Sequence, residues 1–220
     1  MKQKNIFVNG ESDNWFFRNK EFLLNQKEFI DVNEILCYIG ESNNILEIGC
    51  SNGTKLNYIE KKLPNLNLSL FGIDPSVKSI EDGQSKFSNL KLAVGTSDLL
   101  NYQDDFFDVV IVGFCLYLVD RNLIFKTISE IDRVLKQNGF LVITDFETPF
   151  PIKKPYIYRE GVYSYKNNYS NFFVGGGHYN LLRKIHFSHS DLIFESNFNE
   201  RISSSILYKE NLNEVYRELI

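Results

Sequence analysis

Between residues 44 and 145 the sequence alternates short apolar segments with longer amphipathic ones, and this alternation constrains the fold more than any other feature. The apolar segments are NILEIG, LSLFGID, LKLAV, FDVVIVG and GFLVITD, at 44–49, 68–74, 90–94, 107–113 and 139–145. Strands that are apolar throughout are typical of a parallel sheet covered on both faces. The amphipathic segments supply the covering helices, so the sequence predicts an α/β fold.

The flanking segments extend this sheet and add a cap. Residues 13–39 have apolar positions at helical spacing, and 178–188 and 201–209 have the pattern of two more strands. We therefore predict a Rossmann-like, mostly parallel sheet of seven strands, with helices on both faces and an antiparallel pair at its C-terminal edge. We expect a single domain over 1–220, with a helical cap at 1–40, a ligand-binding core at 41–146, and a cover with the edge strands at 147–220.

Two local patterns refine this prediction. Asp120 stands where an N-cap belongs, before a helix that we expect to reach Gln137 and to end at Gly139. Residues 146–178 are rich in Pro, Tyr, Lys and Gly, so we expect an irregular cover over the sheet.

Composition excludes several classes of protein. The formal net charge of -4 argues against a nucleic-acid partner, because binding a phosphate backbone needs a basic surface. The longest apolar run, at 109–119, is too short to span a membrane, so no membrane partner is expected. Three scattered cysteines and the absence of an apolar leader at the start predict a cytoplasmic protein. Oligomeric state is left open.

The loop after the first apolar segment, EIGCSNG at 47–53, resembles a nucleotide-binding turn but lacks its middle glycine. In a dinucleotide fold that glycine lets the backbone approach a pyrophosphate, and here Ser51 takes its place. A ligand without phosphates, such as S-adenosylmethionine, does not need it. We predict that Gly49 allows close approach of the ligand, that Gly53 makes the turn into the helix, and that Glu47 attracts an ammonium group. Cys50 lies between them and is included in the predicted site.

The loops after the next strands add further ligand contacts, because the carboxyl ends of parallel strands meet at one edge of the sheet. Asp74 ends the second strand, 25 residues after Gly49, where an acidic residue can bind ribose hydroxyls, and Pro75 offers an apolar edge to a purine. The other predicted contacts follow the third and fourth strands: Thr96, Ser97 and Asp98 for adenine, Gly113 for the amino-acid part of the ligand, and Phe114 and Tyr117 for a substrate pocket.

Together the motifs ExGCxxG, GIDPS, GTSDLLNYQDDFFDVVI and ISEIDRVLKQNGFLVITDF resemble the class I S-adenosylmethionine-dependent methyltransferases, in the small-molecule branch often labelled type 11. The resemblance covers 40–146, about half of the chain. It implies S-adenosylmethionine as cofactor, with Glu47 and Gly49 at its methionine end, Asp74 at the ribose and 96–98 around adenine. Thr96 departs from the family, which usually has Asp there, and Asp98 is the alternative adenine contact.

The acceptor side is predicted less directly. Methyl transfer to a hydroxyl or ammonium requires a base, and the sequence offers His178, Asp145 and Tyr117, with Glu147 as a further choice. His186 and His189 flank an edge strand and are expected to be structural or solvent-facing. No residues show metal-ligand spacing, so no metal is expected.

The stretches FETPFP and YSYKNNYSNFF resemble methyltransferases of surface-glycan and unusual-sugar pathways, which makes a sugar precursor one expected acceptor among small molecules. Two alternatives stay open: a methyltransferase-like regulatory subunit without catalysis, and an NAD-dependent oxidoreductase. The helix that carries Trp15 and Arg18 is either a lid over the cofactor, with Arg18 near its carboxylate, or an amphipathic helix packed on the sheet.

Overall fold

The computed structural model describes residues 2–40, 43–188 and 193–216, so His189 lies outside the described residues. The helical elements are α1 (Gln3–Ile6), η1 (Phe7–Glu11), α2 (Ser12–Asn25), α3 (Ile30–Ile35), η2 (Leu36–Tyr38), α4 (Thr54–Lys62), α5 (Val77–Lys86), η3 (Leu116–Leu118), α6 (Ile124–Val134), α7 (Asn171–Val174) and α8 (Leu212–Val215). The strands are β1 (Asn44–Ile48), β2 (Ser69–Asp74), β3 (Lys91–Val94), β4 (Phe107–Gly113), β5 (Leu135–Phe146), β6 (Ile152–Pro155), β7 (Tyr163–Lys166), β8 (Tyr179–Ser188) and β9 (Arg201–Lys209).

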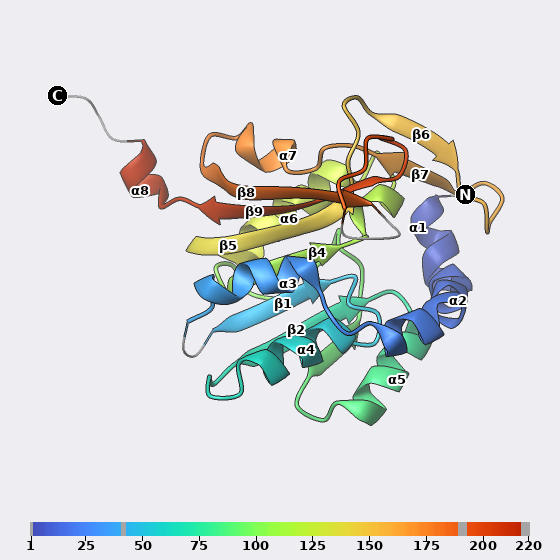
Figure 1. Cartoon of the computed structure of the whole chain (residues 1–220), viewed down its shortest axis with the longest axis horizontal. Coiled ribbons are helices and arrows are strands. Elements are labelled where there is room, and N and C mark those ends of the chain that lie inside the picture. Colours follow the sequence, from blue (N-terminus) through green and yellow to red (C-terminus); the bar gives the residue numbers. More distant parts are fainter. Residues whose placement is uncertain (1, 41–42, 189–192, 217–220) are drawn as a thin grey trace.

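Seven strands form one sheet in the order β3-β2-β1-β4-β5-β9-β8 (Figure 1). Strands β1 to β5 are parallel to their neighbours, β9 runs antiparallel to β5, and β8 runs antiparallel to β9. The predicted Rossmann-like sheet with an antiparallel pair at its edge is confirmed. The order reverses beside β1, between β2 and β4, and a sheet of this kind binds its ligand at the carboxyl ends of the strands near that switch.

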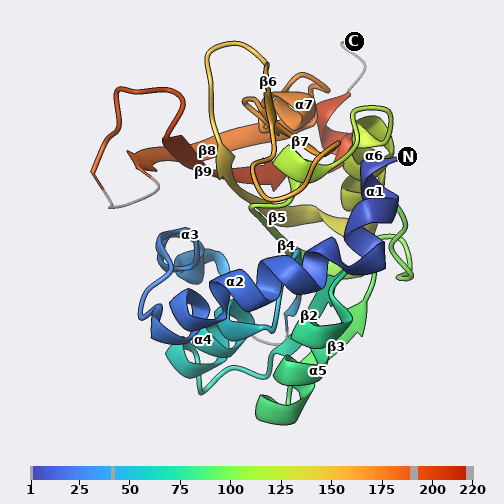
Figure 2. The ribbon, with the colours of Figure 1, turned by 90° about the vertical axis from the view of Figure 1, so that its right-hand side faces the viewer.

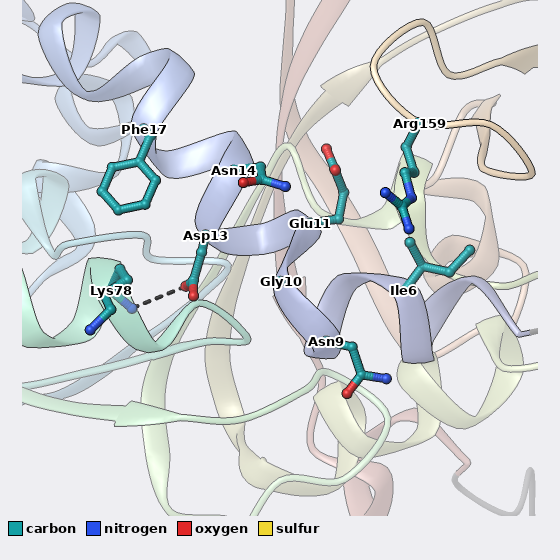
Figure 3. Close-up of a pocket in the computed structure, with 9 residues that line it drawn as sticks. All are labelled: Ile6, Asn9, Gly10, Glu11, Asp13, Asn14, Phe17, Lys78 and Arg159. Carbon is teal, nitrogen blue, oxygen red and sulfur yellow. Dashed lines mark hydrogen bonds between the residues drawn. The ribbon is translucent and has the colours of Figure 1, made fainter.

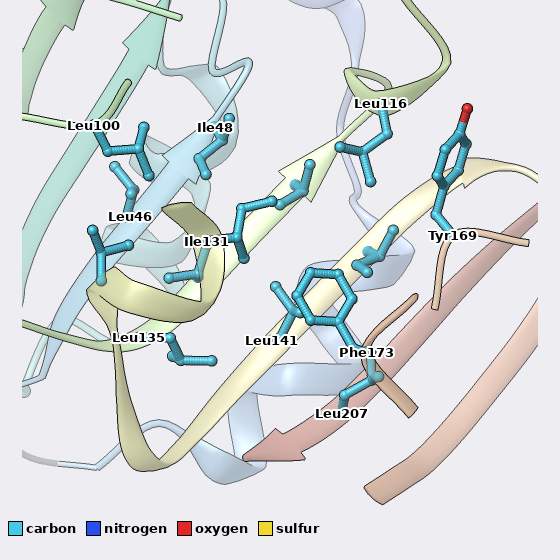
Figure 4. Packing of buried hydrophobic residues seen from close by; sticks show 14 of the residues in the cluster. Leu46, Ile48, Leu100, Leu116, Ile131, Leu135, Leu141, Tyr169, Phe173 and Leu207 are labelled. Atoms are coloured by element: carbon cyan, nitrogen blue, oxygen red, sulfur yellow. The ribbon is translucent and has the colours of Figure 1, made fainter. Parts of the chain in front are cut away.

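The core has two layers because alternate residues of each strand point to opposite faces. On one face, Val109 and Ile111 of β4 pack with residues of α3, α4 and α5. On the other, Val110 and Val112 pack with α6 and with Phe173 of α7, as the close-up of this cluster shows (Figure 4). Burial on both faces holds the strand ends, and the loops that follow them, in fixed positions.

The N-terminal segment crosses the carboxyl ends of the strands (Figure 2). The helical path is broken at Asn9 and Gly10, where Gly10 has φ 121°. A pocket of about 300 Å³ is lined by residues of α1, η1 and α2 together with Lys78 and Arg159 (Figure 3). Asp13 of α2 accepts bonds from the Ser76 hydroxyl and the Lys78 amide, which ties α2 to the start of α5.

The structure corrects two local predictions. Asp120 does not cap the following helix, whose N-cap is Leu123; its carboxylate instead accepts from the amides of Gln3 and Lys4 and so caps α1. Gly139 does not end a helix either, because α6 stops at Val134 and the chain passes directly into β5.

The cover is also more regular than expected. Residues 146–178 contain the two-stranded β6–β7 sheet and the short helix α7. Within the described residues, no helix is long and apolar enough to cross a membrane. The division of the chain at residues 40 and 146 stays a prediction.

Candidate active site

A cavity of about 1000 Å³ opens at the carboxyl ends of β1, β2, β4 and β5. Ten of the eleven predicted ligand-binding residues line it: Glu47, Gly49, Cys50, Asp74, Pro75, Thr96, Ser97, Asp98, Gly113 and Phe114. The remaining one, Gly53, lies behind the loop, where its Cβ would meet Leu90 and Leu92. Its φ of 78° makes the turn into α4, as expected for a glycine at that point.

The loop after β1 brings its backbone to the cavity wall. Gly49 has φ 76°, and a Cβ atom there would lie 3.1 Å from the Cβ atom of Cys115. Ser51, at the place of the missing glycine, also has a left-handed backbone, with φ 48°. Its amide donates to Asp74, and its buried hydroxyl has no partner among the described residues. The serine thus keeps the backbone shape of the glycine that it replaces.

Glu47 ends β1 as a buried carboxyl group beside a partly buried lysine, Lys55, that sequence analysis missed. Lys55 Nζ lies 2.5 Å from Asp31 Oδ2 and 3.6 Å from Glu47 Oε1. Burial raises the pKa of Glu47 to about 8, although the charge of Lys55 opposes this rise. Glu47 Oε2 has no hydrogen-bond partner among the described residues. Two carboxylates against one ammonium leave this end of the cavity suited to a cation.

Asp74 is held at the end of β2 by the backbone around it. Its two oxygens accept from the amides of Ser51 and Ser76, at 2.9 and 2.8 Å. Desolvation raises the pKa of Asp74 to about 6, against the lowering effect of these amides. An oriented carboxylate on the cavity wall can still accept bonds from ligand hydroxyls, because each oxygen has a second lone pair.

The loop after β3 places Thr96, Ser97 and Asp98 on the wall, but Asp98 is already paired. Lys4 of α1 reaches across and binds both of its oxygens, at 2.8 and 2.7 Å. The ammonium of Lys4 helps to hold the pKa of Asp98 below its usual value, against the effect of burial. This ion pair joins the N-terminal segment to the end of the cavity predicted for adenine.

Of the three predicted catalytic residues, only Tyr117 lines the cavity. Asp145 is buried beneath the loop after β4, where it accepts from the amides of Tyr117 and Phe146. Burial raises the pKa of Asp145 to about 7. Its position supports the loop and does not face the cavity.

The structure does not bring the predicted histidine to the cavity. His178 lies against Asp132 of α6, with His178 Nε2 at 3.3 Å from Asp132 Oδ1. Glu147 pairs with Lys184 at 3.0 Å and with His186 at 3.3 Å, likewise outside the cavity lining. Arg18 binds Glu11 and the hydroxyl of Tyr156 and is not among the residues that line the cavity.

The cavity walls opposite the strand ends are formed by α2 and by the cover. Sequence analysis left the role of α2 open and missed the part played by the cover residues. Trp15 of α2 faces the cavity, which supports the lid interpretation, while Phe16 beside it is buried in the protein. The cover contributes Lys154, Tyr156, Ser164 and Lys166. Alternation along IKKP and YSYK is the signal that could have placed these lysines on one face.

Residues 45–139 match the protein family described as "Methyltransferase domain". Residues 45–139 are thus a methyltransferase domain, whose motifs are those of the class I S-adenosylmethionine-dependent type. A tRNA N(3)-methylcytidine methyltransferase of Schizosaccharomyces pombe is 27% identical over 70% of this chain and 53% of its own length. A ubiquinone/menaquinone biosynthesis C-methyltransferase of Citrifermentans bemidjiense is 30% identical over 49% of this chain and 47% of its own. The chain thus spans about half the length of the relatives it matches.

Solved structures share the fold of this methyltransferase domain over most of the chain. The 1,6-didemethyltoxoflavin-N1-methyltransferase of Burkholderia thailandensis, bound to 1,6-didemethyltoxoflavin and S-adenosylhomocysteine, has a TM-score of 0.70 at 10% identity, covering 96% of this chain and 91% of that one. A methyltransferase of Methanosarcina mazei has a TM-score of 0.65 at 16% identity, covering 84% and 99%.

The residues of the cavity fit S-adenosylmethionine, the cofactor of the domain. The two buried polar atoms without partners at the first loop, Glu47 Oε2 and Ser51 Oγ, both belong to cavity-lining residues. Asp74 presents its carboxylate beside them. Buried polar groups normally have partners, so unpaired ones at a cavity wall point to a polar ligand.

Proposed function

We propose that this chain transfers a methyl group from S-adenosylmethionine to a small-molecule acceptor held in the same cavity. One observation carries the proposal: a single cavity of about 1000 Å³ joins the ten residues predicted for the cofactor with a separate wall from α2 and the cover. This volume is at the upper end of the usual range for ligand pockets, so it has room for a cofactor together with a small acceptor.

The protein's part in the reaction is to bind, orient and exclude water. The cofactor supplies a methyl carbon activated by a sulfonium. Asp74 is placed to hold the ribose, and Glu47 to hold the ammonium group at the methionine end. The segment from Gln3 to Asn25 covers the strand ends. Orientation of reactants in such a closed site can contribute about 7–11 kcal/mol.

Tyr117 is the predicted catalytic residue that we retain at the acceptor. Burial raises the pKa of its hydroxyl, so the group stays protonated and acts as a hydrogen-bond donor that orients the acceptor. Asp145 supports it from beneath by fixing the Tyr117 amide. His178 is not retained, because it lies against Asp132 on α6.

For the acceptor we favour a sugar or surface-glycan precursor. The motif resemblance supports this class, as do the aromatic side chains on the wall, Trp15, Tyr117, Phe146 and Tyr156, which can pack against a ring. One relative is named for a tRNA, but the net charge of -4 does not favour RNA. The cytoplasm remains the proposed location of the protein. The absence of a metal also remains a prediction. In residues 2–40, 43–188 and 193–216, no three or more His, Cys, Asp or Glu residues are grouped so that they could hold a metal ion.

Calorimetric titration tests the cofactor assignment. S-Adenosylmethionine and S-adenosylhomocysteine should bind, and NAD should not. Asp74→Asn should weaken S-adenosylhomocysteine binding roughly tenfold, because a charge-assisted bond to a hydroxyl is lost. Asp104→Asn, on an exposed loop, is the matched control and should bind like the parent protein. Equal affinity of the parent and Asp74→Asn would remove the ribose assignment.

Turnover tests the catalytic part of the proposal. Release of S-adenosylhomocysteine is measured with neutral, anionic and aromatic small acceptors. Methylation of any of them supports the enzyme. Cofactor binding without turnover on any acceptor favours the regulatory-subunit alternative, and binding of NAD alone favours the oxidoreductase.

A further inference from the structure

The β6–β7 sheet presents one face to the cavity, and that face carries two lysines. Lys154 pairs with Ser164 across the strands, and the next pair on the same side is Ile152 with Lys166. Because directly opposite residues of an antiparallel pair share a face, Lys154, Ser164 and Lys166 lie together. All three line the cavity.

Lys166 is buried, which is unusual for a lysine. It is 7% exposed, its Nζ donates to the carbonyl of Asn199, and it lies 4.0 Å from the centre of the Phe146 ring. Within the described ranges, neither Lys154 nor Lys166 forms an ion pair with a carboxylate. Two ammonium groups on one face repel each other, so their placement has a cost in the absence of an anion.

The charges around this face leave it positive. Burial lowers the pKa of Lys166. The charge of Glu200 opposes this effect, the charge of Lys154 adds to it, and Asp145 opposes it more weakly. Glu200 also lines the cavity, but it is exposed, so water screens its charge. The most buried charged group on the wall formed by the cover is therefore the ammonium group of Lys166. It donates one hydrogen bond, to the carbonyl of Asn199, and has further N–H groups that can donate to a ligand.

The same face lies next to the residues expected around the reacting methyl group. The Phe146 ring, against which Lys166 lies, is 5.2 Å from the ring of Tyr117 and 5.8 Å from that of Phe114, measured between centroids. Both of those rings follow β4 and line the cavity. An anion held at Lys166 is thus one aromatic ring away from the loop that faces the cofactor.

We propose that Lys166 and Lys154 form an anion subsite that binds a phosphate or carboxylate group of the methyl acceptor. This inference rests on the proposed function and deepens it: the acceptor is a small anionic molecule, such as a sugar phosphate or a sugar acid. The anion relieves the repulsion between the two lysines and fixes the acceptor's ring against Phe146 and Tyr117. Lys166 is then a specificity-determining residue.

The subsite is tested on protein saturated with S-adenosylhomocysteine, by calorimetry at constant ionic strength with four probes: inorganic phosphate, a hexose 1-phosphate, a hexuronate and the uncharged hexose. The hexose 1-phosphate and inorganic phosphate should bind more tightly than the hexose. Binding of the hexuronate in place of the phosphates would also support the proposal and would identify a carboxylate as the natural group. Lys166→Met should weaken the favoured anion about tenfold or more, and Lys166→Arg should retain more of the affinity.

Lys153→Met is the matched control, because Lys153 lies on the opposite face of the same strand, with Nζ 3.8 Å from the centre of the Tyr163 ring. This variant should bind every probe like the parent. The proposal is overturned if no anionic probe binds more tightly than the hexose, or if Lys166→Met and Lys153→Met behave alike. It is also overturned if Lys166→Met lowers the affinity for S-adenosylhomocysteine itself, since Lys166 would then serve the cofactor. Failure of the parent protein to bind S-adenosylhomocysteine would instead refute the proposed function.

Discussion

Ser51 and Gly49 show how single residues shape the loop that faces the cofactor. Both have positive φ, yet only Gly49 avoids the steric cost that a side chain has in that region. Ser51 accepts that cost, and its amide is directed at Asp74 as a result. The left-handed backbone at position 51 is therefore what lets the loop after β1 bond to Asp74 at the end of β2, and it does not require a glycine there.

Gly49→Ala should affect both stability and binding. The new Cβ would lie 3.1 Å from Cys115 Cβ at a residue with φ 76°, so we expect a loss of about 1–2 kcal/mol in the free energy of unfolding. Because Gly49 lines the cavity, S-adenosylhomocysteine affinity should also fall, by roughly tenfold. Denaturant unfolding and calorimetry measure the two effects.

Gly161→Ala separates these causes. Gly161 has φ 78°, but nothing lies within 4 Å of its would-be Cβ, and it does not line the cavity. The backbone cost should therefore appear without any loss of affinity. Equal cofactor affinity in Gly49→Ala and Gly161→Ala would contradict the close approach that we assign to Gly49.

At residue scale, the sequence predicted the strand-end contacts because the position of a residue after a parallel strand determines where it lies. Glu47 and Asp74 reached the cavity for that reason. Lys55 and Asp31 were missed because their pairing joins α4 to α3 across the fold, which no local pattern records. His178 was chosen because a histidine side chain can accept a proton near neutral pH, and residue type carries no information about position.

Among the elements, the N-terminal segment has the greatest influence on the cavity. Asp120 caps α1, Gln3 bonds to the carbonyls of Leu118 and Tyr163, and Lys4 pairs with Asp98. These bonds join the segment to the loops after β3 and β4 and to β7. The Gly10 kink then turns the chain so that α2 continues across the strand ends. The segment is thus fixed at its first turn, in the position that the lid interpretation predicts.

Asp120→Ala should loosen this N-terminal segment. Loss of an N-cap costs about 1 kcal/mol, which corresponds to roughly fivefold more opening of the elements that depend on it. Hydrogen exchange of the amides in α1 and α2 should accelerate by that factor, with little change in β4 or β5. S-Adenosylhomocysteine affinity should fall by a smaller factor, because part of the cavity wall is lost.

The control for this variant is Glu21→Ala, an exposed position on α2 itself. It should leave both the exchange of α1 and the cofactor affinity unchanged. If Asp120→Ala instead accelerated exchange in α6 and left α1 unaffected, the residue would be the cap of α6 after all. The sequence suggested Asp120 as the cap of α6 because an N-cap is predicted from the residues that directly follow it. The amides that Asp120 binds, those of Gln3 and Lys4, are more than a hundred positions away in the chain.

In the whole molecule, the charge is unevenly distributed around the cavity. The end of the cavity that we assign to the cofactor carries Glu47 and Asp74. Desolvation raises their pKa values to about 8 and about 6, and raises that of the buried Asp145 to about 7. The acceptor wall carries Lys154 and Lys166. Once a bound ammonium group favours the ionised form of Glu47, a cationic methionine end and an anionic acceptor would each meet the opposite charge, so electrostatics helps to direct the two ligands to their own ends.

This distribution predicts how stability depends on pH. In the unfolded chain these three carboxyl groups lose their protons near pH 4, whereas in the native protein they keep them until about pH 6 to 8. The native state therefore binds more protons across this interval, and its stability falls as pH rises. Carboxyl groups in ion pairs, such as Asp82 with a pKa of about 2, change their contribution only at more acidic pH.

Thermal unfolding of the ligand-free protein should therefore show a melting temperature that decreases from about pH 5 to about pH 8. S-Adenosylhomocysteine, whose ammonium group favours the ionised form of Glu47, should raise the melting temperature more at pH 8 than at pH 6. Glu47→Gln should flatten the decrease between these two values and reduce the stabilisation by the ligand. A melting temperature that rises over the interval, or a ligand effect independent of pH in the parent protein, would show that Glu47 is ionised before the ligand arrives and that the cation site is already formed.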